Sequence, residues 1–121
     1  MPKIIYIAHQ FANDPKGNIK RILNICKEVH SKDILPFTPY MAALHYLNDT
    51  IPEERALGMT LSAEFFKRKV IDEVWLCGST ISNGMKEEIK LAKKYNIPIK
   101  FHNKELEKVL KVDEIEARKS T

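Results

Sequence analysis

Polar side chains that could act on a small ligand follow the apolar run Val74–Cys77. The segment Gly78-Ser79-Thr80 comes directly after this run, and Ser82, Gly84 and Glu88 follow it. Hydroxyl groups, glycines that allow close backbone approach and the positive end of a helix together favour an anionic ligand. A carboxylate in the next turn would add a nucleophile or a base. The sequence therefore predicts a ligand-binding segment between residues 78 and 88.

Glu88 lies at the edge of an apolar stripe on its predicted helix. Met85, Ile89 and Ala92 recur at helical spacing and are expected to face the core, while Lys86 points outward. Charged residues on helices are usually solvated, so Glu88 is either exposed or directed into the ligand pocket.

Glu64 is a second candidate carboxylate. It follows Leu57 and Leu61 on a predicted helix and precedes Arg68 by four residues. One interpretation is a surface ion pair with Arg68, worth a few tenths of a kcal/mol. The other is a partner of Glu88 in acid–base chemistry. The pattern leaves both open.

A second polar loop follows the apolar run Ile4–Ala8 and begins at His9. It contains neither a G-x-G-x-x-G nor a Walker pattern, so dinucleotide and triphosphate-hydrolase sites are not favoured. Asn18 and Arg21, on the helix that follows, either hold a phosphate or serve as a cap and a surface charge. His9 is either structural or catalytic. The remaining histidines lack partners at ligand spacing, so no metal site is expected.

Apolar strands must alternate with helices to position these loops. We predict strands at 4–8, 34–37, 74–77 and 97–101, and a helix after each, with further helix in pieces over 41–48. The third helix should start near Thr50 and end near Lys69, and the next should be capped by Ser82 or Asn83. This order predicts a three-layer α/β/α fold, flavodoxin- or Rossmann-like, with a parallel sheet of four to five strands. Pro36 suits an edge strand.

Ligands in such sheets bind at the carboxyl ends of the strands, near the point where the strand order reverses. Those ends are Ala8–Asn13, Phe37–Tyr40 and Gly78–Gly84. The site is therefore expected among these three loops.

Composition restricts the class of protein. The 121 residues suit a single domain, 1–121, whose last residues, 116–121, are expected to fray. No apolar run approaches the roughly 18–20 residues of a membrane helix, and no secretory signal is recognisable. The two cysteines lie in apolar runs, which suits a cytoplasmic protein. The net charge is +4, but lysines alternate with glutamates as on solvated helices, so no polynucleotide partner is expected.

Four short motifs occur together in order: Tyr6-Ile7-Ala8-His9 with Phe11, then Pro36–Tyr40, then Asp72–Gly78, then Ile81–Met85 with Glu88. With them, residues 3–101 resemble the nucleoside 2-deoxyribosyltransferase-like superfamily. The resemblance is greatest to its small branch common in bacteria and phages, which is related to the deoxynucleoside 5′-monophosphate N-glycosidases.

The resemblance implies roles for individual residues. Glu88, just before Ile89 and four before Ala92, matches the family's nucleophile, and Ser82 matches a phosphate-contacting serine six residues earlier. Glu64, eight residues before Asp72, matches the acid/base position, where the family usually has aspartate. Tyr6 matches an aromatic residue near the sugar. The expected substrate-binding residues are Ala8, His9, Phe11, Asn18, Arg21, Gly78, Ser82, Gly84 and Met85.

The family resemblance implies an enzyme acting on the N-glycosyl bond of a deoxynucleoside or its 5′-monophosphate, by transfer or hydrolysis through a covalent glutamyl-sugar intermediate. The expected partners are this small molecule and further copies of the chain in a homo-oligomer, without cofactor, metal or membrane. A non-catalytic nucleotide-binding or sequestering protein on the same fold is the alternative. A flavodoxin-like redox or signalling domain is a third hypothesis.

Overall fold

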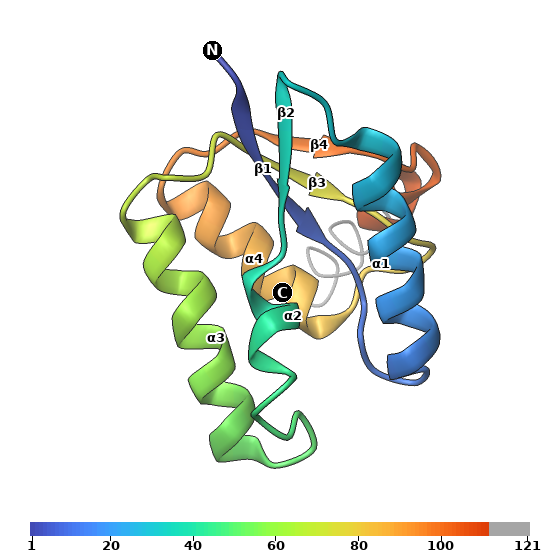
Figure 1. Ribbon diagram of the computed structural model, residues 1–121, viewed down its shortest axis with the longest axis vertical. Coiled ribbons are helices and arrows are strands. Elements are labelled where there is room, and N and C mark those ends of the chain that lie inside the picture. Colours follow the sequence, from blue (N-terminus) through green and yellow to red (C-terminus); the bar gives the residue numbers. More distant parts are fainter. Residues whose placement is uncertain (112–121) are drawn as a thin grey trace.

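The computed structural model, which describes residues 1–111, confirms the predicted alternation of strands and helices (Figure 1). The tail predicted to fray, 116–121, lies outside the described residues. In chain order the elements are β1 (Lys3–Ala8), α1 (Pro15–Val29), β2 (Ile34–Phe37), α2 (Pro39–Ala43), α3 (Pro52–Lys67), β3 (Glu73–Leu76), α4 (Asn83–Lys94) and β4 (Ile99–Phe101). A further helical segment is described over 105–111.

The four strands form one parallel sheet in the order β2-β1-β3-β4. β2 is an edge strand, as its proline predicts, because Pro36 has no N–H to donate to a second neighbour. The chain passes from β1 to β2 on one side and then crosses back to β3 on the other. The strand order therefore reverses between β1 and β3, and the loops that leave these two strands flank the usual ligand-binding crevice.

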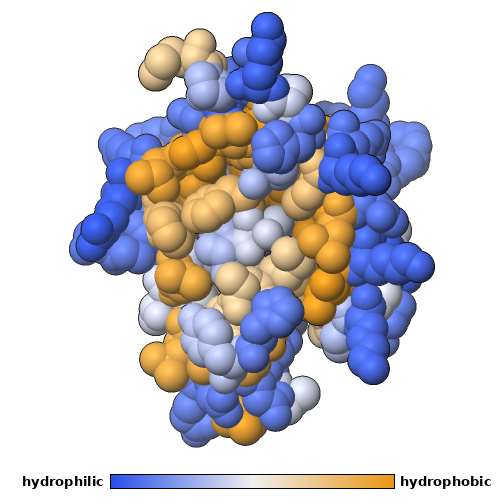
Figure 2. Space-filling view, in the orientation of Figure 1, coloured by the Kyte–Doolittle hydropathy of each residue, from blue (hydrophilic) through white to orange (hydrophobic). Residues whose placement is uncertain are grey.

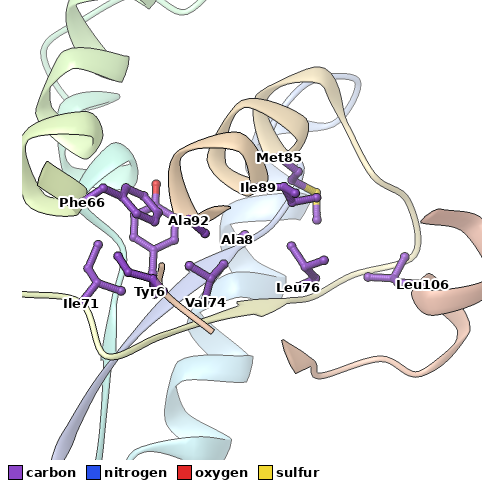
Figure 3. Packing of buried hydrophobic residues seen from close by; sticks show 11 residues of the cluster. Tyr6, Ala8, Phe66, Ile71, Val74, Leu76, Met85, Ile89, Ala92 and Leu106 are labelled. Atoms are coloured by element: carbon purple, nitrogen blue, oxygen red, sulfur yellow. The ribbon is translucent and has the colours of Figure 1, made fainter. Parts of the chain in front are cut away.

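Alternate side chains of β1 divide between two apolar clusters. Ile5 and Ile7 pack with Ile22 of α1 on one face of the sheet. Tyr6 and Ala8 point to the other face, where α3 and α4 cover the sheet (Figure 3). The second cluster also includes Phe66 of α3, Val74 and Leu76 of β3, and Met85, Ile89 and Ala92 of α4. The three-layer α/β/α fold is confirmed.

Helix boundaries agree with the sequence pattern within a few residues. Ser82 is the N-cap of α4, and its Oγ accepts a hydrogen bond from the Met85 backbone N–H at 3.2 Å. α3 starts at Pro52, close to the predicted start near Thr50, with Ile51 as its N-cap, and the Thr50 hydroxyl bonds the Asn48 side chain. β4 begins at Ile99, two residues later than predicted.

In Figure 2 hydrophilic side chains lie mostly around the rim of the view and hydrophobic ones nearer its middle. Among the large apolar side chains that stay exposed are Tyr46 and Leu57. Within residues 1–111 no helix combines the length and the apolar character needed to cross a bilayer.

Candidate functional site

Two cavities flank the crevice between the β1–α1 loop and the β3–α4 loop. The first, of about 590 Å³, we call the Glu88 cavity, and the second, of about 630 Å³, the Arg21 cavity. Both volumes are in the range of small-molecule sites. His9, Gln10 and Thr80 line both cavities. The Thr80 hydroxyl donates a hydrogen bond to the Gln10 side-chain oxygen, and this contact joins the two loops across the crevice.

Glu88 is the buried carboxyl group of the Glu88 cavity. Its residue is 7% exposed, although it stands in the second turn of a helix whose other charged residues are solvated. Burial raises the pKa of Glu88 to about 8, while a hydrogen bond from Tyr6 and the positive charge of Arg55 act in the opposite direction. A carboxyl group with this pKa changes its charge close to physiological pH, which is the behaviour expected of a reacting group.

Tyr6 connects Glu88 to the protein interior. Its ring packs on Phe66 with ring centroids 5.0 Å apart, and its hydroxyl lies 3.0 Å from the Ser62 hydroxyl of α3. A hydroxyl group has one proton and two lone pairs, so Tyr6 can donate to Glu88 while it accepts from Ser62. Burial first, and then the charge of Glu88, raise the pKa of Tyr6 well above its usual value. Tyr6 therefore keeps its proton and fixes the position of the carboxylate.

Arg55 brings a positive charge to the same cavity. Its Nη1 lies 2.8 Å from Asp49 Oδ1 and 3.4 Å from the Tyr40 hydroxyl, and Tyr40 also bonds Asp49. A β-carbon placed on Gly84 would lie 3.1 Å from Nη2 of Arg55, so the guanidinium group lies against the start of α4. Glycine at this position leaves the room that the guanidinium group occupies.

The start of α4 adds further groups that favour an anion. Ser82 and Gly84 line the cavity, and the first turn of α4 contains no acidic residue. The backbone N–H groups of a first helical turn carry the positive end of the helix dipole. Together with Arg55 they form a surface that suits a phosphate group in contact with Ser82.

Asn18 and Arg21 lie in the Arg21 cavity, away from Glu88. The side-chain amide of Asn18 donates to the carbonyls of Phe11 and Ala12, both at 3.1 Å, and so shapes the first loop. Arg21 forms an ion pair with Asp14 at 3.2 Å. Asp14, not Asn18, caps α1, and its carboxylate occupies the positive end of that helix. The N-terminus of α1 is therefore already neutralised.

Glu64 lies on the outer surface of α3. Its carboxylate pairs with Arg68 Nε at 2.9 Å, and the hydrogen bond from Arg68 lowers its pKa. It borders a separate cavity beside Tyr46 and Leu57 and is not among the residues around the Glu88 cavity. Within one chain, the two predicted carboxylates are not brought together.

The structure thus divides the predicted binding residues between the Glu88 cavity, the Arg21 cavity and the core. The Glu88 cavity contains His9, Phe11, Ser82, Gly84, Met85 and Glu88, with Tyr6 bonded to Glu88. The Arg21 cavity contains His9, Asn18, Arg21 and Gly78. Ala8 is fully buried in the core below them.

Three residues near Glu88 were missed from the sequence: Tyr40, Arg55 and Ser62. Tyr40 directly follows the second strand, within one of the three expected loops. Arg55 lies in the first turn of α3, where a positive charge is unfavourable because it opposes the helix dipole. This unfavourable position could have marked Arg55 as a candidate site residue. The burial of Ser62 could not be predicted from the sequence, because the side chain of a serine within a helix usually points to solvent.

Residues 3–102 match the family described as Domain of unknown function (DUF7768). The matched range contains the strands β1–β4, the helices α1–α4 and all the site residues named above. No curated protein sequence matches the chain.

Proposed function

The chain belongs to the DUF7768 family, and we propose that it breaks the N-glycosyl bond of a 2′-deoxynucleoside or its 5′-monophosphate. The observation that carries this proposal is the buried carboxyl group of Glu88, hydrogen-bonded by Tyr6 in a cavity of about 590 Å³. The resemblance to the nucleoside 2-deoxyribosyltransferase-like superfamily supplies the type of reaction.

Glu88 acts as the nucleophile in this proposal. Its carboxylate oxygen bonds to C1′ while the C1′–N bond breaks and its electron pair goes to the base, through an oxocarbenium-like state. Water or a second base then takes the sugar from Glu88. Only the ionised carboxylate attacks, and Arg55 and the Tyr6 hydrogen bond both favour this form against the effect of burial.

A 5′-phosphate is proposed to bind at the start of α4. Ser82 would donate its hydroxyl proton, and Arg55 would supply a charge-assisted hydrogen bond. Arg55 is already oriented by Asp49, so little side-chain entropy is lost when the anion binds. Asn18 and Arg21 are not needed for this contact, because their polar groups are engaged in the first loop.

The test is incubation of the protein with each deoxynucleoside and each 5′-monophosphate, followed by chromatography for free base. Arg55→Gln should raise KM for the monophosphate by about 10- to 100-fold and change KM for the nucleoside little, since one charge-assisted hydrogen bond is worth roughly 1.5–3 kcal/mol.

Lys67→Gln is the matched control, because this cation is exposed at the far end of the same helix. It should leave both KM values unchanged. No base from any substrate would contradict the enzyme proposal. An equal effect of Arg55→Gln on nucleoside and monophosphate would contradict the phosphate site.

A non-catalytic nucleotide-binding protein is the second candidate, and one observation favours it. Glu64, the residue in the acid/base position of the related family, lies outside the Glu88 cavity. Measurable binding of a nucleotide without release of base from any substrate is the result that this candidate predicts.

A further inference from the structure

Another cavity, of about 330 Å³, adjoins the Glu88 cavity and is lined by residues of α3 and α4. We call it the Lys90 cavity. The two cavities share the lining residues Arg55, Met59, Asn83 and Gly84. The other residues that line the Lys90 cavity are Lys86, Glu87 and Lys90, all exposed on α4. A ligand held in the Glu88 cavity beside Arg55 and Gly84 therefore has space to extend into the Lys90 cavity.

The Lys90 cavity is lined by more positive than negative charge. Its cations are Arg55, Lys86 and Lys90, and its one acid among the described residues is Glu87. Asp49, which pairs with Arg55, lines neither this cavity nor the Glu88 cavity. Glu87 pairs with Lys90 at 3.3 Å, and both side chains of this pair are mostly exposed. An exposed ion pair contributes little, so a ligand with several negative charges can replace Glu87 beside Lys90.

The start of α4 has positive charge beside it and no acid in its own first turn. The first turn of α3, by contrast, contains Glu53 and Glu54. Lys86 is the fourth residue of α4, and the guanidinium group of Arg55 lies against Gly84. Positive charge close to the positive end of a helix is unfavourable unless an anion lies beside it. An anionic ligand would relieve this repulsion.

Lys86 and Lys90 lie one turn apart on the same face of α4. In an α-helix the side chains tilt toward the N-terminus, and residues four apart are neighbours on the surface. The ammonium group of Lys90 accordingly reaches back to Glu87. From Gly84 to Lys90 the helix rises about 9 Å, at 1.5 Å per residue. A chain of phosphate groups that starts beside Gly84 therefore meets Lys86 first and Lys90 next.

We infer that the Lys90 cavity holds the β- and γ-phosphates of a 2′-deoxynucleoside 5′-triphosphate. The inference rests on the phosphate site of the proposed function, which puts the 5′-phosphate at the start of α4. The α-phosphate contacts Ser82 and Arg55 there, and the outer phosphates contact Lys86 and Lys90. The phosphate chain takes no part in the reaction at C1′. The preferred ligand is therefore a nucleoside polyphosphate, and the monophosphate binds more weakly because it leaves the Lys90 cavity unfilled.

The test compares the affinities of the 5′-monophosphate and the 5′-triphosphate of each 2′-deoxynucleoside. Affinities are measured by calorimetry with Glu88→Gln, which keeps the ligands intact, and with EDTA, which removes divalent cations from the triphosphate. The triphosphate should bind about tenfold more tightly or better. In the same background, Lys90→Gln should weaken binding of the triphosphate by about threefold to tenfold, the effect of one lost charge contact, and that of the monophosphate by less than about twofold.

Lys94→Gln is the matched control. Lys94 is exposed on α4 one turn beyond Lys90 and is not among the residues that line the Lys90 cavity. The control removes the same charge and should leave both affinities unchanged. Lys90→Arg keeps the charge and should keep the preference for the triphosphate. Equal affinities for monophosphate and triphosphate, or equal effects of Lys90→Gln and Lys94→Gln, would overturn the inference.

Base release by the wild-type protein separates this inference from the proposed reaction. Release of base from a monophosphate, with equal affinities for monophosphate and triphosphate, would overturn the inference alone. Preferential binding of the triphosphate that is lost in Lys90→Gln, without release of base from any substrate, would support the inference and overturn the proposed reaction. If no nucleotide binds, both fall.

Discussion

Replacement of Glu88 by glutamine is expected to reduce base release by about a thousandfold or more. The amide keeps the size of the side chain and can still accept a hydrogen bond from Tyr6, but it has no carboxylate oxygen to bond to C1′. A thousandfold corresponds to about 4 kcal/mol of transition-state stabilisation, which is reasonable for loss of a nucleophile. The measurement is kcat/KM from chromatography of the free base.

Glu87→Gln is the matched control for this variant. Glu87 is the preceding residue of α4, is exposed and pairs with Lys90, so the same chemical change is made outside the cavity. It should leave kcat/KM within about twofold of wild type, since exposed ion pairs contribute little. Activity that survives in Glu88→Gln, or that is lost equally in Glu87→Gln, would contradict the role of Glu88.

The second large effect concerns stability and does not depend on any substrate. The pKa of Glu88 is raised from 4.5 to about 8 in the folded protein. Between these two values the folded state holds a proton that the unfolded chain has lost, so the free energy of unfolding must fall as the pH rises. The slope is about 1.4 kcal/mol per pH unit, which accumulates to a few kcal/mol across the window.

Glu88→Gln should remove this loss of stability. The variant should be close to wild type at pH 5 and more stable by a few kcal/mol at pH 9, as measured by urea unfolding at each pH. Glu87→Gln should follow the wild-type curve. Parallel curves for wild type and Glu88→Gln across the whole range would show that Glu88 is ionised at neutral pH in the folded protein.

The order of the elements and the edge strand could be predicted because each depends on local pattern, whereas the pattern left open whether Glu88 is exposed or buried. The spacing of Met85, Ile89 and Ala92 defines the inner face of α4, and Glu88 borders it. On α3 the apolar residues Leu57 and Leu61 do not mark the buried face in the same way. Its buried residues are Gly58, Ser62 and Phe66, whereas Leu57 is 59% exposed.

Small residues make up much of the buried face of α3. A β-carbon at Gly58 would lie 2.8 Å from the Tyr40 ring, so glycine allows α3 to approach that ring closely. A hydrophobic pattern cannot report such packing, so it could not decide whether Glu64 pairs with Arg68 at the surface or joins Glu88 in a cavity. The contacts of Asn18 with two loop carbonyls, and of Arg55 with Asp49, also depend on three-dimensional proximity that residue spacing does not encode.

The most direct test of the proposed reaction is the mass of the peptide that contains Glu88 after a rapid acid quench during turnover. A covalent mechanism predicts that this peptide carries an added 2-deoxyribosyl group, or its 5-phosphate, and that fragmentation places the group on Glu88. The adduct should be absent from Glu88→Gln. Steady release of base without any adduct, or with an adduct on another residue, would contradict Glu88 as the nucleophile.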